Sequence, residues 1–206
     1  MACLEINPTY IRLRMGIGEE IYFSVDIETS GPIPGEFSML TLGACVVDKM
    51  DQTFAMTLRP DSMRVDEEAL KVTGLSIENL LVEGENVETA MQSFRDWVTS
   101  CSGQRRPVFI GLNAAFDWSF VNYYFHKYCG GNPFGFAALD IKSLFMGHAN
   151  VEWSQTKASQ IAKMYGAQRC NTHNALKDAL FQAELFNLIR RDADKFHAAA
   201  VVNRKE

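Results

Sequence analysis

Four acidic residues and one histidine, spread over three motifs, could together carry out metal-dependent chemistry. Asp26 and Glu28 interrupt a very apolar segment, and Asp117 and Asp178 each interrupt a segment of helical periodicity. His173 lies five residues before Asp178. A buried carboxylate without a partner is costly, so acids at positions where apolar residues are expected indicate a cation. The set points to a site that binds two metal ions and cleaves phosphodiester bonds.

The first two acids are expected on one face of a strand. Residues 21–28 are rich in β-branched and aromatic side chains, which is typical of a strand. Residues i and i+2 of a strand point to the same face, so Asp26 and Glu28 project together. Val25 and Ile27 point the other way. An Asp-x-Glu triplet also occurs on solvated edge strands, so by itself it is a weak signal.

Helical wheels place the other two acids on inward faces. At about 100° per residue, aromatic and aliphatic side chains surround Asp117 and Asp178, and polar side chains occupy the opposite sides. Each acid alone could equally be a helix cap or an ion-pair partner. Together with the strand pair, the two acids favour a shared cation. His173 follows Asn171-Thr172, which indicates a loop or the first turn of a helix.

The elements that must position these residues alternate between strand and helix. Apolar runs at 39–47 and 54–58 predict two further strands, antiparallel because the connections are short. The run at 107–112 predicts a buried strand that leads into Asn113, an expected N-cap, and a helix to about Tyr128. Further helices are predicted at 66–72, 76–81, 86–100, 156–165 and 174–191, with a short extended segment at 137–141.

Charge is unevenly distributed along the chain. The net charge of −5 argues against a protein that coats nucleic acid through a broad basic surface. Residues 19–100 hold sixteen acids and five bases, whereas 141–177 hold five bases and a single acid, Glu152. The carboxyl-terminal half could face a polyanion, although ordinary solvated charges explain the same pattern.

The three motifs, in this order, resemble those of the DEDDh-type (DnaQ-like) 3′-to-5′ exonucleases. That group contains the proofreading subunit of bacterial replicative polymerases, ribonuclease T and oligoribonuclease. The similarity extends over nearly the whole chain and includes the segment 68–75 between the first two motifs. It implies a ribonuclease H-like α/β fold, with a mixed five-stranded sheet whose first three strands are antiparallel, flanked by helices. The motifs are Asp26-Ile27-Glu28-Thr29, Asn113-x-x-Phe116-Asp117 and His173-x-Ala175-Leu176-x-Asp178-Ala179.

The resemblance also implies a role for each acid. Asp26, Glu28, Asp117 and Asp178 would hold two Mg²⁺ or Mn²⁺ ions per active site, and His173 would be the general base. The substrate would be the 3′ end of a single strand, and the products would be nucleoside 5′-monophosphates. Because the acids contact phosphate and not sugar, DNA, RNA and short oligonucleotides all stay open as substrates. The expected substrate contacts are Thr29, Ser30, Met39, Leu40, Asn113 and Phe116, with Phe37 and Trp153 as further candidates for base stacking.

Two positions depart from the family pattern. Leu112 stands where members commonly carry a histidine, and Thr41 stands where they commonly carry a glutamate that contacts the 3′-terminal nucleotide in some members. Two alternative functions stay open: a ribonuclease H-type endonuclease, and a nucleic-acid-binding module on the same fold without turnover. Relatives include monomers and dimers, so a homodimer is one expected state, and association with a polymerase is undecided.

Length and composition favour one domain. The 206 residues are 47% hydrophobic and contain no internal repeat or Pro/Gly/Ser-rich linker. We expect an N-terminal extension at 1–18, an exonuclease domain at 19–191 and a fraying C-terminal tail at 192–206. No apolar run approaches the ~20 residues of a membrane span, so no membrane association is expected. Five scattered cysteines without a Cys-x-x-Cys pair predict reduced thiols and a cytoplasmic location.

Overall fold

The computed structural model describes residues 19–168 and 173–202, and beyond residue 194 it describes the backbone alone. The predicted N-terminal extension, residues 1–18, lies outside the described residues. None of the described helices is both long enough and apolar enough to cross a membrane. Cys45, Cys101 and Cys129 are free thiols, as predicted, and the other two cysteines are not among the described residues.

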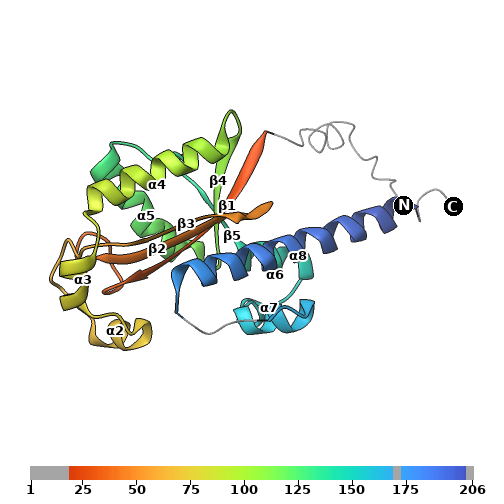
Figure 1. The fold of residues 1–206 in the computed structure, drawn as a ribbon. Helices are drawn as coiled ribbons and strands as arrows, with labels where there is room; N and C mark the ends of the chain where they lie inside the picture. Colours follow the sequence, from red (N-terminus) through yellow and green to blue (C-terminus); the bar gives the residue numbers. More distant parts are fainter. Residues whose placement is uncertain (1–18, 169–172, 203–206) are drawn as a thin grey trace.

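A mixed five-stranded sheet forms the centre of the molecule, in the order β3-β2-β1-β4-β5 (Figure 1). β1 (Glu20–Thr29) pairs antiparallel with β2 (Met39–Val46), which pairs antiparallel with β3 (Lys49–Thr57). On its other side β1 pairs parallel with β4 (Arg106–Gly111), and β4 pairs parallel with β5 (Ala138–Asp140). This arrangement confirms the predicted mixed sheet with its three antiparallel strands.

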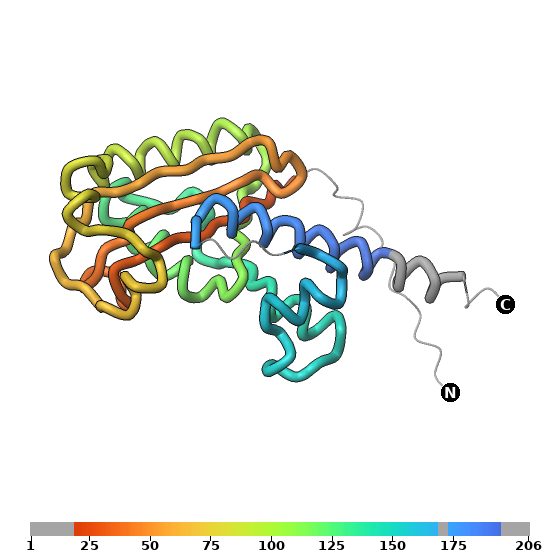
Figure 2. Tube along the Cα trace, turned by 60° about the horizontal axis from the view of Figure 1, so that its bottom comes forward, coloured from red at the N-terminus to blue at the C-terminus, as the bar shows by residue number. Residues whose placement is uncertain are grey.

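Helices cover both faces of the sheet (Figure 2). One face packs against α4 (Val87–Ser102) and α5 (Ala114–Cys129), around a core rich in aromatic side chains that includes Phe23, Phe94 and Phe109. On the other face lies α8 (Ala175–Val202), the long blue helix of Figure 1, together with α6 (Ile141–Ala149) and α7 (Ala158–Tyr165). Three short elements complete the fold: α2 (Glu67–Thr73), α3 (Ile77–Glu83) and the 3-10 helix η1 (Trp153–Gln155).

Local signals explain most helix boundaries. Asp66 caps α2 by accepting hydrogen bonds from two backbone N–H groups of the first turn. The predicted end of α7 at Gly166 is confirmed, since this glycine adopts the left-handed conformation with φ 70°. The predicted start of β3 is wrong, and so is the predicted end of α8. β3 begins at Lys49 instead of 54, because the polar first half of this strand lies at the edge of the sheet and alternates between exposed and half-buried side chains.

The last helix also departs from the prediction. α8 continues past Arg191 to Val202, so the predicted helix end is wrong. The reason is local propensity. Residues 192–202 contain neither glycine nor proline and include Ala198-Ala199-Ala200, and alanine is the strongest helix former.

Candidate active site

Three of the four predicted acids converge between β1 and the first turn of α8. Asp26 and Glu28 point to the face that α8 covers, while Val25 and Ile27 are buried in the core on the other face. Asp178 lies in the first turn of α8. Among the described residues, one carboxylate oxygen each from Asp26, Glu28 and Asp178 lies within 4.8 Å of the other two. Oxygen donors at this spacing suit a hard divalent cation.

A glycine on the neighbouring strand allows α8 to come this close. Gly43 of β2 stands opposite Asp26 in the antiparallel register. A Cβ atom at Gly43 would lie 2.1 Å from the backbone nitrogen of Leu176 and 2.3 Å from the carbonyl carbon of Ala175. The start of α8 therefore rests directly on the backbone of β2, and this contact places Asp178 beside Asp26.

The fourth acid lies beside β1, where it contacts the backbone. Asp117 is buried, as the helical wheel predicted, with 6% of its surface exposed. Its Oδ1 accepts a hydrogen bond from the backbone N–H of Ile27 at 3.1 Å. It is not part of the group of three acids, but its charge acts on Asp26. Asp117 thus acts on the site from the edge of β1.

The helix that carries Asp117 is capped by an acid that the sequence analysis missed. Asn113 stands at the predicted N-cap position of α5, but it adopts the left-handed conformation with φ 73° and its side chain makes no capping hydrogen bond. Instead, Asp140 Oδ2 accepts from the N–H of Ala114 at 2.8 Å. Asp140 Oδ1 accepts from the N–H of Ser143 at 2.7 Å, and so Asp140 also caps α6. The pattern Asp-x-x-Ser after a short apolar strand was the available signal.

His173 and the three converging acids face one cavity of about 200 Å³. His173 is exposed, just before α8, and has φ 40°. The predicted position in a loop next to the helix is confirmed. The residues around the cavity are Asp26, Ile27, Glu28, Leu112, His173, Asp178, Phe181 and Gln182.

A second cavity of about 270 Å³ shares Glu28 and His173 with the first. Leu42, Met56 and Leu75 contribute apolar walls. Thr41, which stands opposite Glu28 in the β1–β2 register, also borders it. The hydroxyl oxygen of Thr41 is buried and has no hydrogen-bond partner among the described residues. A polar atom of this kind is one that a bound ligand could satisfy.

One further polar side chain enters the first cavity. Gln182 lies on α8 one turn after Asp178 and is 4% exposed. Its Nε2 donates to Asp26 Oδ1 at 2.5 Å, and its Oε1 accepts from the backbone N–H of Leu112 at 2.8 Å. The sequence analysis missed this residue, although the spacing of four residues from Asp178 puts it on the same helix face.

Electrostatic repulsion within the site is strong. Burial raises the pKa of Asp26 well above its ordinary value, and the charges of Asp117, Asp178 and Glu28 raise it further. The hydrogen bond from Gln182 acts in the opposite direction. Like charges held this close disfavour full ionisation of the cluster unless a cation is present.

The pKa values of the neighbouring acids, Asp117 and Glu28, are also raised. Burial raises the pKa of Asp117 to about 7, although the hydrogen bond from the Ile27 N–H lowers it. Burial also raises the pKa of Glu28; His173 opposes this shift and Asp178 adds to it. In the part of the chain that the structure describes, no lysine or arginine forms an ion pair with Asp26, Glu28 or Asp117. The donor set and its repulsion therefore fit divalent cations.

Comparison with known proteins identifies the family. A model of the RNase T family, described as an exonuclease, matches residues 23–186. The chain belongs to this exonuclease family. It is 48% identical over 182 residues to the 3′-5′ DNA exonuclease Cap18 of Escherichia coli, covering 88% of this chain and 97% of that protein. It is 24% identical over 167 residues to the PolC-type DNA polymerase III of Staphylococcus aureus, covering 80% of this chain and 11% of the polymerase.

Solved structures show the same fold. E. coli Exonuclease I in complex with a dT13 oligonucleotide matches with a TM-score of 0.70 at 15% identity, over 87% of this chain and 43% of that one. The nuclease domain of 3′hExo, a DEDDh family member bound to rAMP, matches with a TM-score of 0.65 at 14% identity, over 84% and 92%. The predicted resemblance is confirmed: this is a 3′-to-5′ exonuclease of the DEDDh type with the ribonuclease H-like fold.

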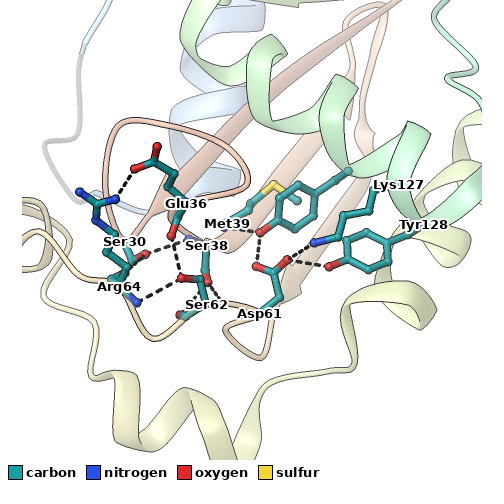
Figure 3. Close-up of polar contacts among 10 residues, drawn as sticks. Ser30, Glu36, Ser38, Met39, Asp61, Ser62, Arg64, Lys127 and Tyr128 are labelled. Atoms are coloured by element: carbon teal, nitrogen blue, oxygen red, sulfur yellow. Dashed lines mark hydrogen bonds and ion pairs between the residues drawn. The ribbon is translucent and has the colours of Figure 1, made fainter.

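Three expected substrate contacts of the exonuclease are structural residues. Ser30, Met39 and Leu40 have no exposed surface. The Ser30 hydroxyl accepts from the N–H of Ser38 and donates to the carbonyl of Arg64, within the hydrogen-bond network shown in Figure 3. Met39 and Leu40 are core residues. In this structure these three side chains therefore offer no surface with which to contact a substrate.

The other expected contacts lie in different settings. Thr29 is buried and its hydroxyl donates to the carbonyl of Gly31, closing the turn after β1. Phe116 is half-buried against the core, and Asn113 is exposed at the start of α5. Phe37 is buried, whereas Trp153 is 50% exposed. The Nζ of Lys142 lies over the Trp153 ring, 4.1 Å from its centre.

Proposed function

We propose that this exonuclease removes nucleoside 5′-monophosphates from the 3′ end of single-stranded DNA, with two Mg²⁺ or Mn²⁺ ions and with His173 as general base. The observation that carries this proposal is the convergence of three carboxylates within 4.8 Å of one another in the cavity that His173 also faces. The DNA substrate is suggested by the name of the E. coli relative, and the single strand by the oligonucleotide in the Exonuclease I complex.

The carboxylates would hold the ions. Asp26, Glu28 and Asp178 offer oxygens directly in the cavity, and Asp117 adds negative charge from the edge of β1. When bound, two divalent ions stabilise the attacking and the leaving oxygens of an in-line displacement at phosphorus. Four carboxylates balance the charge of two such ions, so the phosphate of the substrate can enter without strong repulsion.

His173 would take the proton from the attacking water. Its ring borders both cavities together with Glu28, so it lies beside the carboxylate group. From there it can accept a proton and pass it to solvent, because the side chain is exposed.

The second cavity would receive the 3′-terminal nucleoside. It shares Glu28 and His173 with the first, so a nucleoside there would place its 5′ phosphate at the carboxylates. Leu42, Met56 and Leu75 offer apolar contact to sugar or base. The hydroxyl of Thr41, which has no partner among the described residues, offers a neutral hydrogen bond there.

The experiment that tests this proposal compares Asp178→Asn with the matched control Asp51→Asn, a substitution on the exposed edge strand β3. The substrate is a 5′-labelled single-stranded DNA with Mn²⁺, and products are separated by size. Wild type and Asp51→Asn should give a ladder shortened from the 3′ end. Asp178→Asn should shorten the DNA at least about 10²-fold more slowly than wild type. Equal rates for Asp178→Asn and wild type would contradict the proposal.

The same assay separates the alternatives. A covalently closed single-stranded circle should stay intact, whereas cleavage of the circle would indicate an endonuclease of the ribonuclease H type. Binding of linear DNA without shortening in Mn²⁺ would indicate a binding module. The same assay is run on labelled RNA, a dinucleotide and a duplex beside the DNA. The rates of shortening then rank the four substrates. A homodimer, a polymerase partner and a cytoplasmic location stay predictions.

A further inference from the structure

Gln182 occupies the point at which strands β1 and β4 separate. Their parallel pairing runs from Glu20 opposite Arg106 to Ser24 opposite Ile110. The same offset would place Asp26 opposite Leu112, but the pairing stops before these residues. At this position the Leu112 N–H bonds to Gln182 Oε1. The side chain from α8 thus takes the place of a strand partner.

The chemistry of its partners fixes the orientation of the amide. The backbone N–H of Leu112 can only donate, so the amide oxygen of Gln182 must face it. The amide nitrogen therefore faces Asp26 and donates to Oδ1. A rotation of the amide by 180° would set donor against donor and a carbonyl oxygen against a carboxylate oxygen. The two hydrogen bonds are thus made together or lost together.

This arrangement has a consequence for the carboxylate of Asp26. One of its oxygens, Oδ1, is held by the amide at 2.5 Å, which fixes the plane of the group. The donor is neutral, so it brings no positive charge of its own that would compete with a cation. A lysine or arginine at this position would hold the same oxygen but would compete with a cation for the negative charge of the carboxylate.

We propose that Gln182 is a positioning residue of this exonuclease, which holds the Asp26 carboxylate in the orientation that binds the metal and ties it to the backbone at Leu112. The inference rests on the proposed function, because a metal at Asp26 is what the amide would serve. Groups that hydrogen-bond to metal ligands commonly change metal affinity or activity by about 10- to 100-fold when they are removed.

The test uses two uncharged variants of the full chain. Gln182→Met keeps the approximate size and removes both hydrogen bonds; Gln182→Asn is shorter by one methylene and cannot span Leu112 and Asp26 together. Gln92→Met, at an exposed position on α4, is the matched control. Mn²⁺ binding to the metal-free proteins is measured by calorimetry, in the absence of DNA. Unfolding in urea with a metal chelator shows that each variant is folded.

We expect Mn²⁺ to bind both Gln182 variants about 10- to 100-fold more weakly, with wild-type affinity in Gln92→Met. Folded variants whose Mn²⁺ affinity stays within about twofold of wild type would overturn the inference. That result would leave the proposed function standing, because the proposed function depends on Asp178→Asn. Conversely, full activity of Asp178→Asn would be evidence against the metal site that Gln182 is inferred to serve.

A measurement on the wild-type chain decides the case in which neither variant folds. The side-chain amide protons of Gln182, followed by ¹⁵N NMR, should be protected from exchange with solvent and should shift when Mg²⁺ is added. An amide signal that does not respond to saturating Mg²⁺ would contradict the positioning role.

Discussion

Gly43 and Leu176 are in direct backbone contact across the interface between β2 and α8. The space for a single methyl group is missing, since a Cβ at Gly43 would lie 2.1 Å from the Leu176 nitrogen. The position of α8, and with it the position of Asp178 relative to Asp26, depends on this glycine.

Substitution Gly43→Ala should therefore damage the active site. The added methyl group meets backbone atoms, which cannot rotate away, so α8 must shift. We expect a loss of about 1–3 kcal/mol in the free energy of unfolding and a fall in exonuclease activity of at least tenfold. Urea unfolding and the 3′-shortening assay measure the two effects.

The control for this prediction is Gly147→Ala. Gly147 lies within α6, and a Cβ there would meet no atom within 4 Å. Because alanine favours a helix over glycine by up to about 1 kcal/mol, this variant should be as stable as wild type or more stable. Unchanged activity in Gly43→Ala would show that α8 does not need the close approach.

The stability of the metal-free protein should depend on pH through Asp117. The folded-state pKa of Asp117 is about 7, above the ordinary value for an aspartate, so the folded protein holds a proton that the unfolded chain has lost. Stability is therefore highest below about pH 4 with respect to this group. It falls as the pH rises towards 7, and levels off above. Asp26 acts in the same direction.

Unfolding in urea with a chelator, at intervals between pH 5 and 8, tests this expectation. Asp117→Asn should flatten the decline and be more stable than wild type at pH 8, by on the order of 1 kcal/mol or more. Added Mg²⁺ should stabilise wild type more at pH 8 than at pH 5. A difference between wild type and Asp117→Asn that does not change with pH would contradict the assignment.

The hydroxyl of Tyr124 should contribute to stability more than to catalysis. It donates to Asp61 at 2.6 Å and accepts from the N–H of Met39 at 2.9 Å, and Tyr128 and Lys127 donate to the same carboxylate (Figure 3). Removing it in Tyr124→Phe leaves a buried N–H without its partner. We expect a loss of about 1–3 kcal/mol in urea unfolding.

Tyr123→Phe is the matched control. Tyr123 is the preceding residue on the same helix, is 36% exposed, and makes no hydroxyl hydrogen bond to the described residues. Its loss of stability should stay within about 0.5 kcal/mol. Equal losses in the two variants would mean that the Asp61 network adds nothing to the fold.

Asp140 should link stability to activity, because it caps α6 and also bonds to the first residue of α5. Asp140→Ala should cost about 0.5–2 kcal/mol in the free energy of unfolding and should lower activity by moving the helix that carries Asp117. Asn86→Ala removes a comparable cap from α4, which carries no proposed site residue. That variant should lose similar stability and keep its activity, when both are assayed well below their unfolding midpoints.

The acids of the site could be predicted from the sequence because their positions follow from short-range periodicity. Asp26 and Glu28 share a face through the two-residue repeat of a strand, and Asp117 turns inward through the repeat of a helix. These predictions need no knowledge of which elements pack together. The antiparallel pairing of the first three strands likewise followed from short connections, and the mixed five-stranded sheet from the resemblance to the family.

The residues that were missed depend on tertiary contacts. Nothing within α8 shows that Gln182 faces a strand end some seventy residues earlier in the chain. Asn113 has the usual chemistry of an N-cap, but the left-handed backbone at the end of β4 turns it away and leaves the first N–H of α5 to Asp140. Ser30 directly follows the first motif and Met39 begins β2, yet both are buried: the Ser30 hydroxyl bonds to the carbonyl of Arg64, and the Met39 N–H bonds to Tyr124 of α5.

The distribution of the acids over the chain also bears on how the enzyme is made. Two carboxylates belong to β1, the earliest described element to leave the ribosome, and Asp178 belongs to α8, the latest. Until α8 has been synthesised and has docked over Gly43, the nascent polypeptide has only part of the carboxylate group. The proposed metal site is therefore completed only when the last described helix has docked.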